Sequence, residues 1–219
     1  MTTQPAGKRT LKSWPEGCRA IQLAAAKLNP DGGTWWSDLS TGADGEDGTG
    51  AVNTLNAVRI AEQCKGRNNT PAPRGWDVGT LRSRDIGRNG ETTFSYRISV
   101  PARTIFRRIT VKVALAWDSD VLEWSFLGLT IPIASVLTLD FDLMVYDGGG
   151  NLVGYSGSWD NSYEIAEFRA TPGETYTIKI RCWSGTDDVW YGVAWNTVAT
   201  PLIVLGDLAG ISASARRRG

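Results

Sequence analysis

The spacing of apolar residues divides the chain into a helical front and a strand-rich remainder. In residues 15–28, apolar side chains recur every three or four positions, which predicts an amphipathic helix. Ser13-Trp14-Pro15-Glu16 is typical of a capping box with proline in the first turn. Residues 51–64 repeat the helical spacing, and the glycine- and aspartate-rich stretch before them is typical of a loop. The pattern therefore predicts two helices joined by a long connection.

After residues 68–74, which are rich in turn formers, the period changes from helical to alternating. Several short runs then place an apolar residue at every second position, which is typical of half-buried antiparallel strands. The fold predicted is mainly β, a jelly-roll-like antiparallel β-sandwich preceded by a small helical segment. The core-facing residues predicted by this alternation are Phe94, Tyr96, Ile98, Val100, Ile109, Val111, Val113, Leu115, Trp117, Phe141, Leu143, Val145, Tyr176, Ile178, Ile180, Cys182, Tyr191, Val193 and Trp195.

The change of period also predicts the domain organisation. Residues 1–70 form the helical part, residues 71–200 form the sandwich, and residues 201–219 form a loosely ordered tail. The apolar run at 126–139 contains a proline and is too short to span a bilayer, so we expect a loop or a buried strand there.

Composition removes several classes of function. Lys plus Arg and Asp plus Glu both number 23, so no net charge draws the chain to nucleic acid or to an anionic membrane. The chain has no histidine, which excludes Ser-His-Asp and Cys-His catalysis and imidazole metal sites within it. Composition does not decide whether the chain is part of an enzyme. The chain by itself, however, cannot catalyse a reaction by either of these mechanisms.

Three cysteines leave the redox compartment open. If the two predicted helices pack antiparallel, Cys18 approaches Cys64. A disulfide between them is conceivable, although two buried thiols are the commoner outcome.

Two segments, "WPEGCRAIQLAAAKLN" and "DGTGAVNTLNAVRIAEQ", resemble the helical end of a subtilisin-like serine protease catalytic domain. Three further segments are similar to the β-sandwich that follows this domain in extended subtilases, which is related in style to pre-peptidase C-terminal domains. These segments are "VKVALAWD", "DFDLMVYDGGGNLVG" and "TPGETYTIKIRCW". The family orders its triad Asp, His, Ser, and all three would precede the helix at Pro15. No Gly-Thr-Ser nucleophile motif occurs in this chain, so no catalytic residue is carried over.

The resemblance implies a non-catalytic C-terminal portion of a serine endopeptidase, acting as a stabilising or substrate-presenting module. Its implied partners are the missing catalytic domain, in the same parent chain or in trans, and peptide substrate. The implied location is extracellular, although no signal-peptide pattern follows Met1. Reassembly with a separate catalytic chain predicts an exposed apolar patch near Ile21, Ala25 and Val58. The alternative is a stand-alone module that binds carbohydrate, protein or calcium.

Two carboxylates, Asp140 and Asp142, share one face of a predicted strand about 7 Å apart, which raises the question of what neutralises them. Calcium is one answer, since it takes carboxylate and carbonyl oxygens. The alternative is loop N–H donors or an arginine, with Arg107, Arg108 and Arg169 as candidates. The calcium candidates are Asp140, Asp142, Asp147, Asp160, Asn161 and Glu164.

The ten tryptophans indicate a second kind of site, because exposed indole rings stack on sugars or on peptide side chains. Trp117, Trp183 and Trp195 lie in strand patterns and are expected in the core. The candidates for an exposed binding patch, which lie near predicted loops, are Trp124, Trp159 and Trp190.

Overall fold

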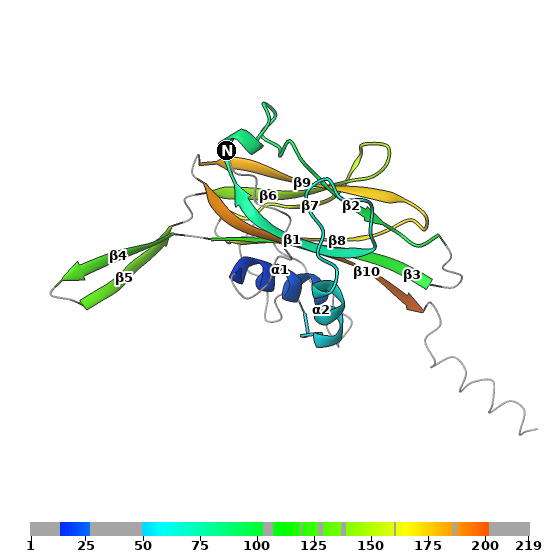
Figure 1. Ribbon diagram of the computed structural model, residues 1–219, viewed down its shortest axis with the longest axis horizontal. Helices are drawn as coiled ribbons and strands as arrows, with labels where there is room; N and C mark the ends of the chain where they lie inside the picture. The colour runs from blue at the N-terminus through cyan, green and yellow to red at the C-terminus, as the bar shows by residue number, and fades with distance from the viewer. Residues whose placement is uncertain are drawn as a thin grey trace, which may run out of the picture.

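The chain folds as two four-stranded antiparallel sheets packed face to face, with two helices on one side (Figure 1). The computed structural model describes residues 14–26, 50–102, 107–118, 120–126, 129–136, 139–159, 161–185 and 188–201. The helices are α1 (Pro15–Ala25), α2 (Thr54–Ala61) and the 3-10 turn η2 (Ser83–Asp85). The strands are β1 (Arg74–Leu81), β2 (Tyr96–Ser99), β3 (Arg107–Trp117), β4 (Asp120–Phe126), β5 (Leu129–Val136), β6 (Asp140–Tyr146), β7 (Leu152–Ser156), β8 (Tyr163–Arg169), β9 (Thr175–Ser184) and β10 (Val189–Pro201).

One sheet, which we call the helix-covered sheet, has the strand order β1-β10-β3-β8. The other, which we call the open sheet, has the order β2-β9-β6-β7. Alternate side chains of both sheets meet in one hydrophobic core that includes Val113, Leu143 and Ile178. The predicted β-sandwich is confirmed, and every core residue predicted from the alternation is buried except Cys182, which is half-buried against the core.

The helix-covered sheet is buried on both faces, whereas the alternating pattern predicted a single apolar face for each strand. On its outer face Ala114 and Ala116 of β3 and Ala194 of β10 form a second cluster with α1. A Cβ at Gly192 would lie 2.5 Å from the backbone of Glu16 and Gly17, so α1 crosses the sheet at backbone contact there. Small side chains on the outer face therefore let the helix lie close to the sheet.

Both predicted helices are present but shorter than expected. The first ends at Ala25 rather than at residue 28, and its N-cap is Trp14, which makes no side-chain capping bond. Ser13 of the predicted capping box lies outside the described residues. The second helix covers only eight residues, because Asn53 Oδ1 accepts the backbone N–H of Asn56 at 3.1 Å and starts the helix there.

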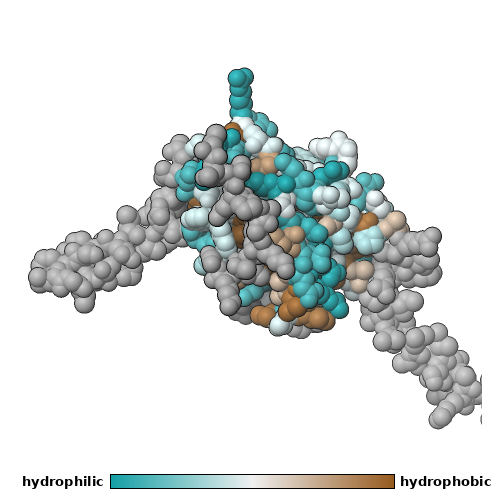
Figure 2. Space-filling model, in the orientation of Figure 1, coloured by the Kyte–Doolittle hydropathy of each residue, from teal (hydrophilic) through white to brown (hydrophobic). Residues whose placement is uncertain are grey.

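The apolar patch expected near Ile21, Ala25 and Val58 is only partly present. Ile21 and Ala25 are buried against the helix-covered sheet, so their part of the prediction is wrong. Val58 is exposed together with Leu55 and Val52. Figure 2 shows brown atoms gathered at the lower edge of the molecule, where α2 lies.

Arg67 ties the linker before β1 to the sandwich. Its Nε donates to the Tyr191 hydroxyl at 3.1 Å, and its Nη2 donates to the Thr80 carbonyl at 2.7 Å. The Tyr191 hydroxyl lies 2.6 Å from that of Tyr96, which donates to buried Asp77 at 2.9 Å. This chain of polar contacts links both sheets to the segment that follows α2.

The apolar run at 126–139 supplies β5, which pairs with β4 in a hairpin that projects from the sandwich (Figure 1). The pairing shifts register between Leu122 and Glu123, and Glu123 is paired with Pro132. Among the described residues, no helix has the length and hydropathy needed to cross a membrane.

Candidate binding surface

The outer face of the open sheet is the candidate site. Its outward positions alternate with core residues along β9, which places Lys179, Arg181 and Trp183 on the outside. Both described helices contact the other sheet instead (Figure 1). This face therefore presents its side chains outward, with no helix of the described part of the chain lying over it.

Two tryptophans dominate one end of this face. Trp159, in the connection between β7 and β8, is 72% exposed, and Trp183 of β9 is 52% exposed. Their rings meet edge to face with centroids 6.2 Å apart at 84°. The Arg181 guanidinium lies 4.9 Å from the Trp183 ring centroid, within cation-π range. Large indoles held in place by each other and by an arginine are typical of a binding surface.

Asp142 lies beside this pair, and its neighbours answer the question of what neutralises it. Asp142 is paired across the sheet with Arg181. The Tyr155 hydroxyl donates to Asp142 Oδ2 at 3.2 Å. Burial raises the pKa of Asp142, while the Tyr155 hydrogen bond and the Arg181 charge lower it. The compensating arginine is thus on the neighbouring strand and is not one of the three arginines considered from the sequence.

The negative charge of Asp140 is compensated by fewer neighbouring groups than that of Asp142. Its Oδ1 is buried with no hydrogen-bond partner in the described structure. Burial raises the pKa of Asp140, and the Asp142 charge raises it further. This end of β6 therefore concentrates negative charge that is poorly neutralised.

Glu164 is buried near the start of β8 and is the most buried of the candidate carboxylates. Its Oε1 accepts the Ser158 backbone N–H at 2.7 Å, and Oε2 accepts the Ser156 hydroxyl. Burial raises the pKa of Glu164 to about 8; the two serine hydrogen bonds lower it, and the charges of Asp142 and Asp140 raise it. Glu164 is therefore mostly protonated at neutral pH.

Of the remaining calcium candidates, Asp147 lies apart from these three, and Asn161 reaches only a hydrogen-bond partner of Glu164. Asp147 lies at the opposite end of β6 and is held by its own turn, where it accepts the backbone N–H groups of Gly149 at 2.9 Å and Asn151 at 2.8 Å. Asn161 donates to Ser158 Oγ at 2.9 Å. Asp160 lies outside the described residues. Within the described ranges, no group of three or more His, Cys, Asp or Glu side chains is placed to hold a metal ion.

The three tryptophans proposed for an exposed patch do not form one cluster. Trp159 lies at the open sheet, whereas Trp190 lies on β10 and meets Trp14 edge to face with centroids 4.5 Å apart. The side chain of Trp124 lies outside the described residues. Trp183, expected in the core, is exposed, so that prediction is wrong; Trp117 and Trp195 are buried as predicted.

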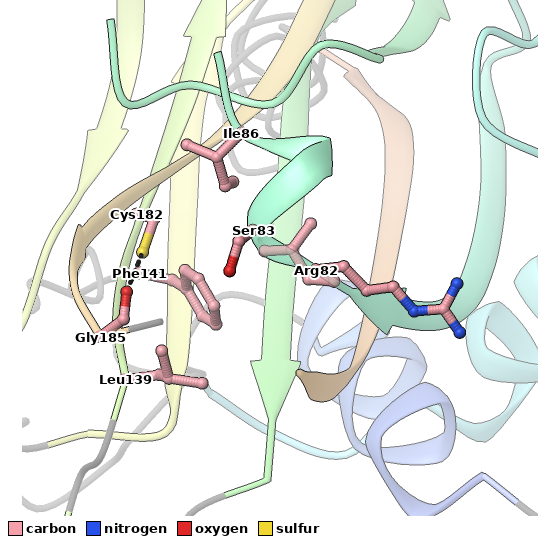
Figure 3. A pocket seen from close by; sticks show the side chains of 8 residues that line it. Arg82, Ser83, Ile86, Leu139, Phe141, Cys182 and Gly185 are labelled. Atoms are coloured by element: carbon pink, nitrogen blue, oxygen red, sulfur yellow. Dashed lines mark hydrogen bonds between the residues drawn. The ribbon is translucent and has the colours of Figure 1, made fainter. Parts of the chain in front are cut away.

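The three cysteines carry thiols, and Cys18 is not bonded to Cys64. Cys182 lines a small cavity at one end of the sandwich, about 20 Å³ in volume, together with Leu139 and Phe141 (Figure 3). Its Sγ lies 3.7 Å from the Gly185 carbonyl. Burial, followed by the Asp140 charge, raises the pKa of the Cys182 thiol, which disfavours a reactive thiolate.

The sequence carried a signal for Trp183 that the core prediction did not use. Alternation places Cys182 on the core face, so its neighbour Trp183 must point outward with Arg181. The contact between Trp183 and Trp159 had no such signal, because it joins a strand to a separate loop.

Two of the solved structures that this chain resembles are only distantly similar to it. No protein-family model matches the chain, and no curated protein matches it. The chain is similar to the pre-peptidase C-terminal domain of collagenase from Bacillus anthracis, with 14% identity and a TM-score of 0.36, over 60% of this chain and 100% of that one. It is also similar to the Yersinia pseudotuberculosis-derived mitogen, with 13% identity and a TM-score of 0.32, over 56% of this chain and 84% of that one. Likenesses this distant carry no argument about this chain, whose β-sandwich rests on its own strand pairing.

Proposed function

We propose that this chain is a non-catalytic β-sandwich module that holds polypeptide substrate for a subtilisin-like serine endopeptidase. The observation that carries the proposal is the exposed Trp159 and Trp183 pair, with Arg181 against it, on the outer face of the open sheet. The link to an endopeptidase rests on the resemblance of the two helical segments. Since the chain has no histidine, the peptide-bond hydrolysis belongs to the parent enzyme.

The chemistry of this surface favours a polypeptide. Indole rings bury a large area at low cost in conformational entropy, and an extended polypeptide offers apolar side chains to cover them. Arg181 next to the rings supplies N–H donors for backbone carbonyls. A sugar ring stacking on Trp159 is the competing occupant and is an outcome of the test below.

The test measures binding of casein, an unfolded polypeptide, to the immobilised chain. We expect saturable binding that falls at least tenfold in Trp183→Ala and in Trp159→Ala, since removing a central aromatic anchor costs roughly 2 kcal/mol or more. Trp190→Ala removes a tryptophan that is also half-exposed but lies on the other sheet, and it should bind casein normally. Equal losses in all three variants, or binding of cellohexaose in place of casein, would contradict the proposal.

The parent enzyme is tested separately by reading the DNA immediately upstream of the codon for Met1. We expect an in-frame continuation that encodes the Asp, His and Gly-Thr-Ser segments of a subtilisin-like domain. An unrelated gene with its own stop codon would remove the protease from the proposal and leave the binding surface to be judged on the casein result.

Calcium at the start of β6 is a second proposal, favoured by one observation. The orphaned Oδ1 of Asp140 lies near Asp142, where a cation would relieve the crowding of negative charge. Two carboxylates are fewer ligands than Ca²⁺ takes, so backbone carbonyls and water would have to complete the shell. Adding CaCl2 should raise the Tm of the native chain but not of Asp140→Asn, and a Tm unchanged by chelation would reject this proposal.

A further inference from the structure

Two arginines line a pocket that the proposed function does not use. The pocket has a volume of about 360 Å³ and lies where β8 leads towards β9. Its lining residues are Arg108, Ile109, Arg169, Ala170, Thr171 and Pro172. It belongs to the helix-covered sheet, whereas the tryptophan pair belongs to the open sheet.

The strand register sets the spacing of the two guanidinium groups. Thr110 of β3 pairs with Arg169 of β8, and the Ala170 N–H donates to the Ile109 carbonyl at 2.9 Å. Arg108 therefore lies diagonally across the strand pair from Arg169, on the same outward face. Diagonal neighbours of this kind have Cα atoms about 7–8 Å apart, within the reach of two long side chains towards one ligand.

The charge in this pocket is not neutralised by the described carboxylates. Both arginines are exposed, and no carboxylate of the described residues forms an ion pair with either of them. One rung further along the same pair of strands, Lys112 has Glu167 at 3.5 Å. On this face Lys112 therefore lies opposite a carboxylate, whereas Arg169 lies opposite Thr110 and both arginines line an open pocket.

An adjoining pocket of about 280 Å³ shares Arg169 and Thr171 and adds Asp147 and Glu174. The Asp147 carboxylate is occupied by its own turn, since the Asn151 side chain and backbone N–H groups bind it and lower its pKa. Thr171 is fixed by its backbone N–H, which donates to the Tyr176 hydroxyl at 2.9 Å. The Thr171 side chain thus stands at a defined edge of the arginine pocket as a further hydroxyl donor.

We infer that Arg108 and Arg169 bind a tetrahedral oxyanion, the phosphate or sulfate group of a ligand, in this pocket. Guanidinium groups match such oxyanions with paired N–H donors, and two of them compensate a charge of minus two. A carboxylate presents only two oxygens in one plane and would use the pair less completely. This site is independent of the casein-binding surface, so either proposal can fail without the other.

The experiment is an NMR titration of the ¹⁵N-labelled chain with inorganic phosphate, inorganic sulfate and acetate in parallel. We expect saturable shifts of the Arg108 and Arg169 side-chain N–H signals and of the backbone amides of residues 169–171, with phosphate or sulfate binding tighter than acetate. Arg108→Gln and Arg169→Gln should each weaken binding about tenfold, as the loss of one charge-assisted contact does. Arg88→Gln, which removes an exposed arginine outside the pocket, should bind as the native chain does.

The variants also separate charge from geometry. Because Arg108 and Arg169 are exposed, the glutamine variants should keep the native amide spectrum elsewhere. Arg169→Lys keeps the charge but loses the paired donors and should weaken binding less than Arg169→Gln. Shifts that do not saturate, an equal loss in Arg88→Gln, or acetate binding as tightly as phosphate and sulfate would each overturn the inference.

Discussion

The outer faces of the two sheets differ in the size of the residues that the strands turn outward. On the helix-covered sheet these include Ala114, Ala116 and Gly192, and α1 lies directly on them. On the open sheet they include Arg181 and Trp183, which remain at the surface. Small outward-facing side chains allow a helix of the same chain to pack on the sheet. Large aromatic and charged side chains leave the other face accessible to another molecule.

Removing a core tryptophan should have the largest effect on this arrangement. Trp195 is fully buried between the sheets, and its Nε1 donates to the Ala72 carbonyl at 3.0 Å. Trp195→Ala leaves a large cavity and removes this hydrogen bond, so the free energy of unfolding should fall by about 3–5 kcal/mol. Urea denaturation followed by circular dichroism measures the change. A loss below about 1 kcal/mol would contradict the assignment of this face as the core.

A pH dependence should follow from the buried carboxyl at the edge of the same core. The pKa of Glu164 is about 8 in the folded chain, above its unfolded value of about 4.3. The contribution of Glu164 to the free energy of unfolding is fully present at pH values below its pKa in the unfolded chain. This contribution is lost as the pH rises through its pKa in the folded chain. Stability should therefore fall by on the order of 3 kcal/mol from about pH 5 to about pH 9.

Glu164→Gln is the variant that isolates this effect. The amide is neutral at every pH and can still accept the Ser158 N–H, so the decline between these pH values should flatten. Burial, with the hydrogen bond to Asp118, raises the pKa of Glu16 to about 7, so a smaller decline of the same sign should remain. An unchanged slope in Glu164→Gln would show that this carboxyl is not the titrating group.

The close approach of α1 to the helix-covered sheet is tested at Gly192. Because an added methyl would meet backbone atoms of Glu16 and Gly17, Gly192→Ala must displace the helix and should cost about 2 kcal/mol of unfolding free energy. Gly66→Ala is the matched control, since no heavy atom lies within 4 Å of its added methyl. Equal stability of the two variants would mean that α1 does not rest on this sheet.

The alternating pattern was enough to predict the core of the sandwich. A period of two fixes which side chains point inward, so Phe94, Val113 and Ile178 were placed correctly without any long-range information. The same pattern does not say what covers the other face. The covering of the outer face depends on packing between α1 and β10, which lie more than 150 residues apart in the chain. The small residues on β3 and β10 were the sequence feature that indicated this packing.

The candidate surface could be predicted only in part. The exposure of Trp159 follows from its place near a turn, and the position of Trp183 follows from alternation once Cys182 is placed inside. Their contact, and the pairing of Asp142 with Arg181, depend on which strands are neighbours. Strand order is set by the whole fold, so a sequence pattern local to one strand could not supply either contact.

Removing Trp183 should have the smallest effect on stability and so sharpens the contrast with Trp195. Trp183 contacts Trp159 and Arg181 at the surface, and Trp183→Ala should change the unfolding free energy by less than about 1 kcal/mol. The same variant should lose casein binding, which separates a binding residue from a structural one. Urea denaturation and the casein assay on the same preparation decide between them. A loss of several kcal/mol with binding retained would mean that this tryptophan holds the sheet together and that the open face has another use.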